Sequence, residues 1–266
     1  MEKIGIIGLG NMGESIVKAL VNHSLKKDFL LFAEVKKERA TYIEKTYGLK
    51  SEKSLSELVR KTDYIVLAIK PQDAKEVIQE ISPSLNDKKL IISIMAGITT
   101  SNILSFIGKP IRIVRLMPNI CVKVGEGVTG ITSTRAVTKE ERAKVQKMLS
   151  PLGHFVEAGE ELMDAVTALG GSGPAFFLLF LEAMIDAGVK TGLPRDKAKA
   201  ISLQVMKGTL KMLEEEKMHP TVMRDMITSP GGTTIAGIAL LEERAFKGNV
   251  IEAVAKACKR AKELSS

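Results

Sequence analysis

The chain is poor in several residue types, and each shortage narrows what the protein can be. Trp is absent and aromatic residues make up 4% of the 266 residues, so the core must consist of Ile, Leu, Val, Ala and Met, and ligand binding by aromatic stacking is not expected. Cys occurs twice, at Cys121 and Cys258, which gives no disulfide framework and no metal-binding spacing. We therefore expect reduced thiols, a cytoplasmic location and no metal site.

Long apolar runs and blocks of like charge are also scarce. The most apolar stretch, Phe176 to Leu181, is too short for a membrane span and is followed by Glu182 and Asp186. The N-terminus enters a strand pattern at once, so we expect no signal peptide. The net charge of +8 is dispersed along the chain, which favours solvated faces first, anionic small molecules second and nucleic acid a distant third. Neither a membrane nor a nucleic acid is expected as a partner.

The length of the chain fits two modest domains or one large domain. In its first part, apolar runs of strand length alternate with helical patterns, and near-continuous apolar runs are typical of parallel strands that are buried on both faces. The runs are 3–7, 29–33, 64–69, 90–95 and 111–117, the helical patterns include 13–23 and 36–47, and capping boxes at 54–57 and 138–141 open further helices. We predict a doubly wound, mostly parallel α/β domain of Rossmann type over residues 1–160, with 127–133 and 155–158 as extra edge strands.

A glycine motif follows the first predicted strand and opens the first predicted helix. It consists of Gly8, Leu9, Gly10, Asn11, Met12 and Gly13. The first glycine suits the tight turn, the second lets the backbone approach a pyrophosphate, and the third lets helix and strand pack closely. In this context the motif predicts a dinucleotide site, and a ligand-free glycine turn is the weaker alternative.

The residues after the second strand leave the type of nicotinamide cofactor open. Glu34 lies 21 positions after Gly13, where an acid favours the ribose hydroxyl of NAD. Lys36, Lys37 and Arg39 follow, and a cation there suits the 2′-phosphate of NADP. Glu34 and Lys36 are also compatible with a local surface pair. We expect NADP or NAD without deciding between them.

Two further strand ends belong to the same predicted edge. They consist of Ala68, Ile69, Lys70 and Pro71 after the third strand and Met95, Ala96 and Gly97 after the fourth. Ligands of open α/β sheets bind beyond the carboxyl ends of the strands, and the small residues 96 and 97 leave room for a nicotinamide ring. Residues 115–119, which end the fifth strand, are expected on the same rim. Ordinary loop chemistry is the alternative.

From residue 161 to 266 we predict an all-helical domain. The helical patterns are 161–169, 174–191, 195–216, 220–227, 234–244 and 248–264. The pattern at 195–216 has a wider apolar stripe than one buried face needs, which suggests burial against a second subunit. Glycine motifs interrupt the helices at 170–174 and 229–234. The second combines a Gly-Gly turn with Thr233 and Thr234 at a helix start, which fits either a helix cap or an anion-binding loop.

Taken together, these motifs resemble the pyrroline-5-carboxylate reductase family over essentially the whole chain. GLGNMG, AIKP, MAG, RLMPN, GGSGPAF, DAGVKTGLPR and SPGGTTIAGIALLEE occur in the family's order. The resemblance implies a Rossmann domain followed by an all-helical dimerisation domain. It also implies reduction of 1-pyrroline-5-carboxylate to L-proline with NADPH or NADH, the last step of proline biosynthesis, in a homodimer or a dimer-based oligomer.

The family's residue roles can be transferred to matching positions. The glycine motif, the two later strand ends, Glu34 and Lys36 are the implied cofactor site. The implied substrate site consists of Ser229, Gly231, Gly232, Thr233 and Thr234, and Thr234 is the implied catalytic residue, near the ring nitrogen. Four positions depart from the family's usual pattern. They are Gly170 instead of Ser, Phe176 instead of Tyr, and Ile120-Cys121 instead of Thr-Pro.

Two competing classes are less favoured. The β-hydroxyacid dehydrogenases share GLGxMG but need a Lys shortly before an Asn at the domain junction, and the corresponding stretch AVTALGGSGPAF has neither. A Rossmann binding module without catalytic activity would not need the SPGGTT loop. The only His residues are His23, His154 and His219, so we expect a mechanism without a strong side-chain acid.

Overall fold

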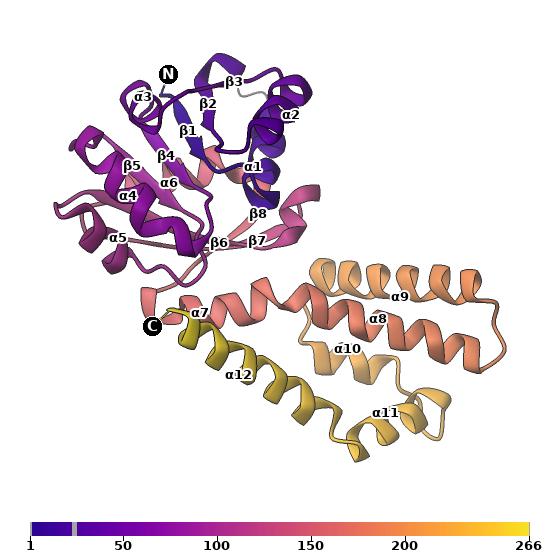
Figure 1. Cartoon of the computed structure of the whole chain (residues 1–266). Coiled ribbons are helices and arrows are strands. Elements are labelled where there is room, and N and C mark those ends of the chain that lie inside the picture. Colours follow the sequence, from indigo (N-terminus) through magenta and orange to yellow (C-terminus); the bar gives the residue numbers. More distant parts are fainter. Residues whose placement is uncertain (1, 23–25, 266) are drawn as a thin grey trace. The chain divides into compact units, whose positions relative to one another are not determined.

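The computed structural model describes residues 2–22 and 26–265 of the chain (Figure 1). The chain forms two compact units. One, here the sheet unit, comprises residues 1–172 and 257–266, and the other, the helical unit, comprises residues 173–256. The predicted helix end at His23 lies outside the described residues.

The sheet unit contains one eight-stranded sheet with the order β3-β2-β1-β4-β5-β6-β7-β8. Neighbouring strands are parallel except β6 and β7, which are antiparallel. The strands are β1 Ile4–Ile7, β2 Leu30–Ala33, β3 Lys50–Ser51, β4 Tyr64–Leu67, β5 Leu90–Ser93, β6 Arg112–Pro118, β7 Gly127–Ser133 and β8 Gly153–Glu157. The mostly parallel α/β fold is therefore confirmed. The two-residue strand β3 escaped prediction because it has no apolar run.

Helices cover both faces of this sheet and form two cores (Figure 1). Ile4, Ile6 and Val66 pack in one core, whereas Ile7 and Ile65 pack in the other, so successive residues of a strand point to opposite faces. The first core includes residues of α1 Asn11–Asn22, α2 Lys37–Tyr47 and α6 Lys139–Met148, and the second includes residues of α3 Leu55–Lys61, α4 Ala74–Ile81 and α5 Thr100–Ile107. Burial on both faces explains the near-continuous apolar runs of β1, β2, β4 and β5.

The two helix starts that the sequence predicts from capping boxes have side-chain caps. Thr138 accepts a hydrogen bond from the N–H of Glu141, whose side chain accepts one from the N–H of Thr138, which completes the capping box. Ser54 accepts a hydrogen bond of 3.2 Å from the N–H of Glu57. These bonds satisfy backbone N–H groups that have no partner within the helix.

A cluster of Glu14, Arg39, Tyr42 and Tyr47, here the Glu14 cluster, joins α1 to α2. The guanidinium of Arg39 forms an ion pair with the Glu14 carboxylate, and Nε of Arg39 donates to the backbone oxygen of Leu9 at 2.6 Å. The hydroxyls of Tyr42 and Tyr47 donate to Glu14 at 3.2 and 2.9 Å. Burial alone would raise the pKa of Glu14, but these hydrogen bonds outweigh burial and lower it. Burial, together with the bond to Glu14, raises the pKa of Tyr47 to about 12.

The junction between the units is helical. α7 Met163–Val166 continues into a π-helical turn, Thr167–Gly171, and then into α8 Gly173–Lys190. A Cβ on Gly130 of β7 would meet Val166, so α7 packs directly on the sheet. The sequence predicts a domain boundary after residue 160, and that boundary stays a prediction. Residues 161–172 are helical, like the predicted second domain, yet they belong to the sheet unit.

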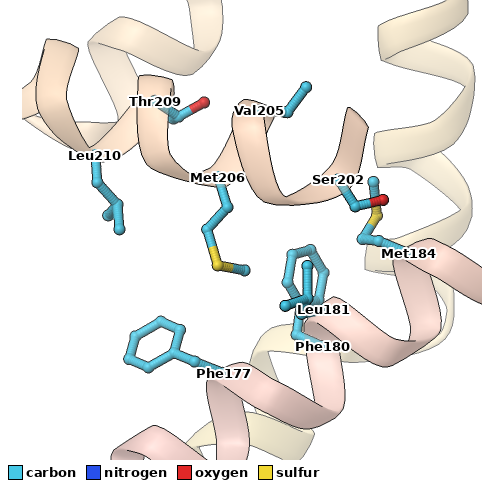
Figure 2. A pocket seen from close by; sticks show the side chains of 9 residues that line it. All are labelled: Phe177, Phe180, Leu181, Met184, Ser202, Val205, Met206, Thr209 and Leu210. Carbon is cyan, nitrogen blue, oxygen red and sulfur yellow. The ribbon is translucent and has the colours of Figure 1, made fainter. Parts of the chain in front are cut away.

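The helical unit leaves much apolar surface uncovered. Its other helices are α9 Arg195–Glu216, α10 Pro220–Met226, α11 Thr233–Glu243 and α12 Phe246–Ser265, whose last residues join the sheet unit. Leu179, Met226 and Ile251 are 67%, 70% and 68% exposed. Between α8 and α9 lies an apolar groove of about 290 Å³, lined by residues that include Phe177, Met184 and Leu210 (Figure 2). These exposed faces are typical of a surface that another protein chain covers.

By length and composition alone, one helical stretch among the described residues, Glu160–Lys190, could cross a membrane. The mean hydropathy reaches 1.6 over an 18-residue window within it. The sequence predicts separate helices at 161–169 and 174–191, whereas in the structure one helical stretch runs from Glu160 to Lys190. Helices that pack against another protein surface have the same composition.

Titration of Tyr47 should be visible in the stability of the protein. A pKa raised from 10 to about 12 means that the folded state keeps the proton more tightly than the unfolded chain does. This contribution to stability is complete below pH 10 and is lost between pH 10 and 12. We expect Tyr47→Phe to be less stable than the wild type at pH 8 by about 1 kcal/mol, after allowance for solvent screening. Urea unfolding should show this difference shrinking above pH 10, and a difference that does not change with pH would contradict the assignment.

Candidate active site

The predicted cofactor residues follow strand ends that lie at the same level of the sheet. Ile7 pairs with Ala33 on one side and Leu67 on the other, and Leu67 pairs with Ser93. The strand order turns at β1, because β2 lies on one side of it and β4 on the other. Open α/β sheets bind ligands at such a switch point, beyond the carboxyl ends of the strands. The sequence-predicted residues at 8–13, 34–36, 68–71 and 95–97 all begin at this edge.

The glycine loop between β1 and α1 has the shape that a dinucleotide requires. Gly8 has a φ of +89°, and a Cβ there would lie 2.8 Å from the backbone oxygen of Ala68. A Cβ on Gly13 would overlap the backbone oxygen of Gly8. At Gly10, by contrast, an added Cβ would have nothing within 4 Å. The outer two glycines are therefore required by the fold, whereas the open space at Gly10 fits the approach of a phosphate group.

The other loop residues offer backbone groups to this space. Leu9 is fully buried, so its side chain belongs to the core. Asn11, Met12 and Gly13 form the first turn of α1, where backbone N–H groups lack partners within the helix. Such N–H groups and the positive end of the helix dipole favour an anion. The loop thus meets the electrostatic needs of a pyrophosphate.

Glu34 connects the glycine loop to the start of α2. Its Oε2 accepts a hydrogen bond from the N–H of Leu9 at 2.8 Å, and its Oε1 accepts one from the N–H of Lys36 at 3.0 Å. The contact with Lys36 is therefore made by its backbone and not, as in the surface pair considered from the sequence, by its ammonium group. The carboxylate is fixed at the end of β2, beside the loop.

The residues that follow β4 and β5 differ in exposure and backbone conformation at this edge. Lys70 is exposed and extended, with φ −70° and ψ 145°, as expected of a residue before Pro71. Ala96 is exposed, and Gly97 has a φ of +76°. Met95 is only 1% exposed and packs in the core, so its backbone rather than its side chain is available at the edge.

The residues expected on the rim after the fifth predicted strand are turned inward. Arg115 is 2% exposed and forms an ion pair with Glu160, which also accepts a hydrogen bond of 2.7 Å from Thr100. The side-chain amide of Asn119 donates to the backbone oxygen of Gly170 at 3.0 Å and so anchors the π-helical turn to β6. Residues 115–119 were expected on the rim, but the side chains of Arg115 and Asn119 turn toward Glu160 and Gly170 instead.

Sequence reasoning missed several residues that shape the site. Glu14 and Glu160 are separated in sequence from the arginines that they bind, Arg39 and Arg115. No local spacing indicates such pairs, because the fold alone brings them together. A Glu in the first turn of a helix that follows GxGxxG is the only sequence signal that pointed to Glu14.

The predicted substrate loop lies in the helical unit, before α11. Gly231 has a φ of +66°, and the N–H of Gly232 donates to the backbone oxygen of Ser229 at 3.1 Å. Gly232 is the N-cap of α11, and no side chain caps the helix there. Thr233 and Thr234 are the first two residues of α11, so the capping role considered from the sequence is not the one they have. The helix start also carries no acidic residue in its first turn, which leaves it suited to an anion.

Side chains that commonly bind metal ions lie apart from one another in the part of the chain that the structure describes. No group of three or more His, Cys, Asp and Glu side chains occurs there that would hold a metal ion. Cys121 and Cys258 are free thiols.

Comparisons with known proteins cover both units. Residues 160–264 match the family described as pyrroline-5-carboxylate reductase dimerisation, and residues 3–97 match NADP oxidoreductase, coenzyme F420-dependent. The chain is 37% identical to the pyrroline-5-carboxylate reductase of Aquifex aeolicus, over 98% of this chain and 97% of that protein. It is 39% identical to the enzyme of that name from Synechocystis, over 98% of both.

Solved structures give the same result. A pyrroline-5-carboxylate reductase from Coxiella burnetii superposes with a TM-score of 0.94 at 31% identity, over 100% of this chain and 99% of that one. The pyrroline carboxylate reductase of Plasmodium falciparum, solved with NADP bound, superposes with a TM-score of 0.89 at 36% identity, over 100% of this chain and 98% of that one. With motifs, fold and near full-length similarity in agreement, the chain belongs to the pyrroline-5-carboxylate reductase family.

Proposed function

We propose that this NAD(P)H-dependent oxidoreductase reduces the C=N bond of 1-pyrroline-5-carboxylate to L-proline, the last step of proline biosynthesis, with the residues described above in specific roles. The assignment of these roles rests mainly on the start of α11. Gly232 is its N-cap and no side chain caps it, so the hydroxyl of Thr234 is not used to cap the helix. The dinucleotide residues are those at the aligned strand ends of the sheet unit. The substrate residues are those of the loop from Ser229 to Thr234.

The proposed dinucleotide site uses backbone more than side chains. The glycine loop and the first turn of α1 bind the pyrophosphate through N–H groups, with Gly10 at the point of closest approach. Glu34 and Lys36 lie toward the adenosine ribose. The stretches from Ala68 to Pro71 and from Met95 to Gly97 border the nicotinamide portion, where the small residues Ala96 and Gly97 leave space for a ring.

The proposed substrate site uses the Gly-Gly turn for the carboxylate. The N–H of Gly232 is bound to the backbone oxygen of Ser229, so the groups offered to the carboxylate are the N–H groups of Thr233 and Thr234 in the first turn of α11, at the positive end of the helix, which favours a negative group. If the carboxylate of the substrate binds there, its imine ring lies beside Thr234. We assign the Thr234 hydroxyl to a hydrogen bond with the ring nitrogen.

The chemistry then depends mainly on positioning. When bound, the reduced nicotinamide supplies the hydride that the imine carbon accepts. Thr234 holds the ring nitrogen and assists its protonation, and the loop amides fix the ring in one orientation. His219 is the N-cap of α10, where it accepts a hydrogen bond from the N–H of Thr221, and His154 lies on β8, the outermost strand. We assign no acid–base role to either of these histidines. Orientation of the substrate, rather than strong acid catalysis, therefore supplies most of the rate enhancement.

Oligomerisation follows from the apolar faces of the helical unit together with the match to a dimerisation family. Residues such as Leu179, Met226 and Ile251 would be covered by a second copy of the chain, as would the apolar stretch of α8. We infer a homodimer, or a larger oligomer built from dimers, in the cytoplasm. Small molecules are its other partners.

A first test concerns the open space at Gly10. Gly10→Ala should leave the unfolding temperature within error, because the new methyl group meets no protein atom within 4 Å. It should weaken dinucleotide binding by about tenfold or more, because the methyl group occupies the path of the pyrophosphate. Gly208→Ala is the control, since that glycine of α9 also has nothing within 4 Å and lies outside the sheet unit. Equal affinity in all three proteins would exclude the assignment.

A second test concerns Thr234. Thr234→Ala should lower kcat by about 10²–10⁴-fold, the usual contribution of proton-transfer assistance, while the fold stays intact. Thr234→Ser should keep much of the activity, because it keeps the hydroxyl. The measurement is steady-state loss of reduced nicotinamide with 1-pyrroline-5-carboxylate. Full activity of Thr234→Ala would remove the catalytic role, and binding of cofactor without any turnover in the wild type would favour a binding module instead.

A third test concerns the oligomer. Sedimentation velocity at micromolar concentration should give a dimer or a multiple of it, and Ile251→Glu, which places a charge on a 68% exposed apolar position, should shift the distribution toward monomer. Glu252→Gln on the same helix is the control. A wild-type monomer would contradict the inference.

A further inference from the structure

We propose that Glu34 makes this protein select NADH over NADPH, because its fixed carboxylate occupies the place that the 2′-phosphate of NADP needs. The inference rests on the proposed dinucleotide site and adds the choice between its two cofactors, which the sequence leaves open.

The position of Glu34 follows from the sheet. Ala33 ends β2 at the level of Ile7, and the N–H of Gly8 donates to the backbone oxygen of Ala33 at 3.0 Å. Glu34 is therefore the first residue beyond β2, directly beside the glycine loop. In dinucleotide-binding sheets of this order, the adenosine ribose lies at the end of the strand next to the loop, and an acid there receives its hydroxyl groups.

Two backbone donors hold the carboxylate in place. Oε2 accepts from the N–H of Leu9 at 2.8 Å and Oε1 accepts from the N–H of Lys36 at 3.0 Å, so both oxygens are anchored. A carboxylate has about four acceptor positions, and two remain for hydroxyl donors of a ribose. A 2′-phosphate has acceptors and negative charge where NADH has a hydroxyl donor, so it would repel Glu34 rather than bind it. Moving Glu34 aside would leave two N–H groups without their partner.

The nearby cations do not offset this carboxylate. Arg39 lies beside the glycine loop, but it is bound to the Glu14 carboxylate and to the backbone oxygen of Leu9. Its charge is thereby neutralised within the Glu14 cluster. Lys36 and Lys37 are exposed, and their flexible, strongly hydrated ammonium groups would have to neutralise Glu34 before they favour a phosphate. The ribose end of the site therefore suits a neutral hydroxyl.

The decisive measurement is equilibrium binding of NADH and NADPH, each followed by nicotinamide fluorescence on the full-length protein. We expect the wild type to bind NADH about tenfold or more tightly than NADPH, since each 1.4 kcal/mol of repulsion gives a factor of ten. Glu34→Ser should weaken NADH binding and strengthen NADPH binding, so that the ratio falls toward one or inverts. Glu34→Gln, which keeps the length of the side chain, should move the ratio in the same direction.

Glu38→Ser is the matched control, because it removes the same charge from an exposed position four residues further along and should leave the ratio unchanged. A wild type that binds NADPH as tightly as NADH, or an unchanged ratio in both Glu34 variants, would overturn the proposal. Turnover of 1-pyrroline-5-carboxylate is measured separately. The expected binding ratio without turnover would support the selection by Glu34 and overturn the proposed reaction, whereas turnover with tighter NADPH binding would do the reverse.

Discussion

The close approach of α1 to the ends of β1 and β4 is the constraint on which the dinucleotide edge depends. Gly13 lies where any side chain would overlap the backbone oxygen of Gly8, and Gly8 lies against the backbone oxygen of Ala68. Because these backbones touch, the first turn of α1 faces the switch point of the sheet. The parallel register then brings the loops after β2, β4 and β5 to the same edge. Moving α1 outward would displace the glycine loop and the N–H groups of its first turn from this edge.

Periodicity and local chemistry predicted most of this arrangement. The five main strands are apolar because both faces are buried, so their signal is strong, and Thr138 with Glu141 indicates a helix start because both bonds are local. Residues that act across long sequence separations were not predictable. Arg115 was expected on the rim, but its partner Glu160 lies 45 positions away and only the packed fold turns the side chain inward. The same reason hid the role of Glu14, which binds residues of a helix that follows a whole strand later.

The two glycine motifs of the second half show where sequence patterns leave alternatives that geometry can narrow. The sequence GGSG, which begins at Gly170, was compatible with a kink or a close helix crossing. In the structure its first two glycines end a π-helical turn, and the side-chain amide of Asn119 donates a hydrogen bond to the backbone oxygen of Gly170. Insertions of this kind are frequent at functional sites. SPGGTT was compatible with a cap or an anion-binding loop, and Gly232 in the capping position leaves the two threonine hydroxyls for other partners.

The chain order of the units has a consequence for synthesis of the protein. Residues 173–256 are inserted into the sheet unit, which regains the chain only at residues 257–266. The sheet can pair its strands during translation, since β1 to β8 end at Glu157. The unit as a whole is completed only after residues 173–256 have been synthesised, because its last segment, residues 257–266, follows them in the chain.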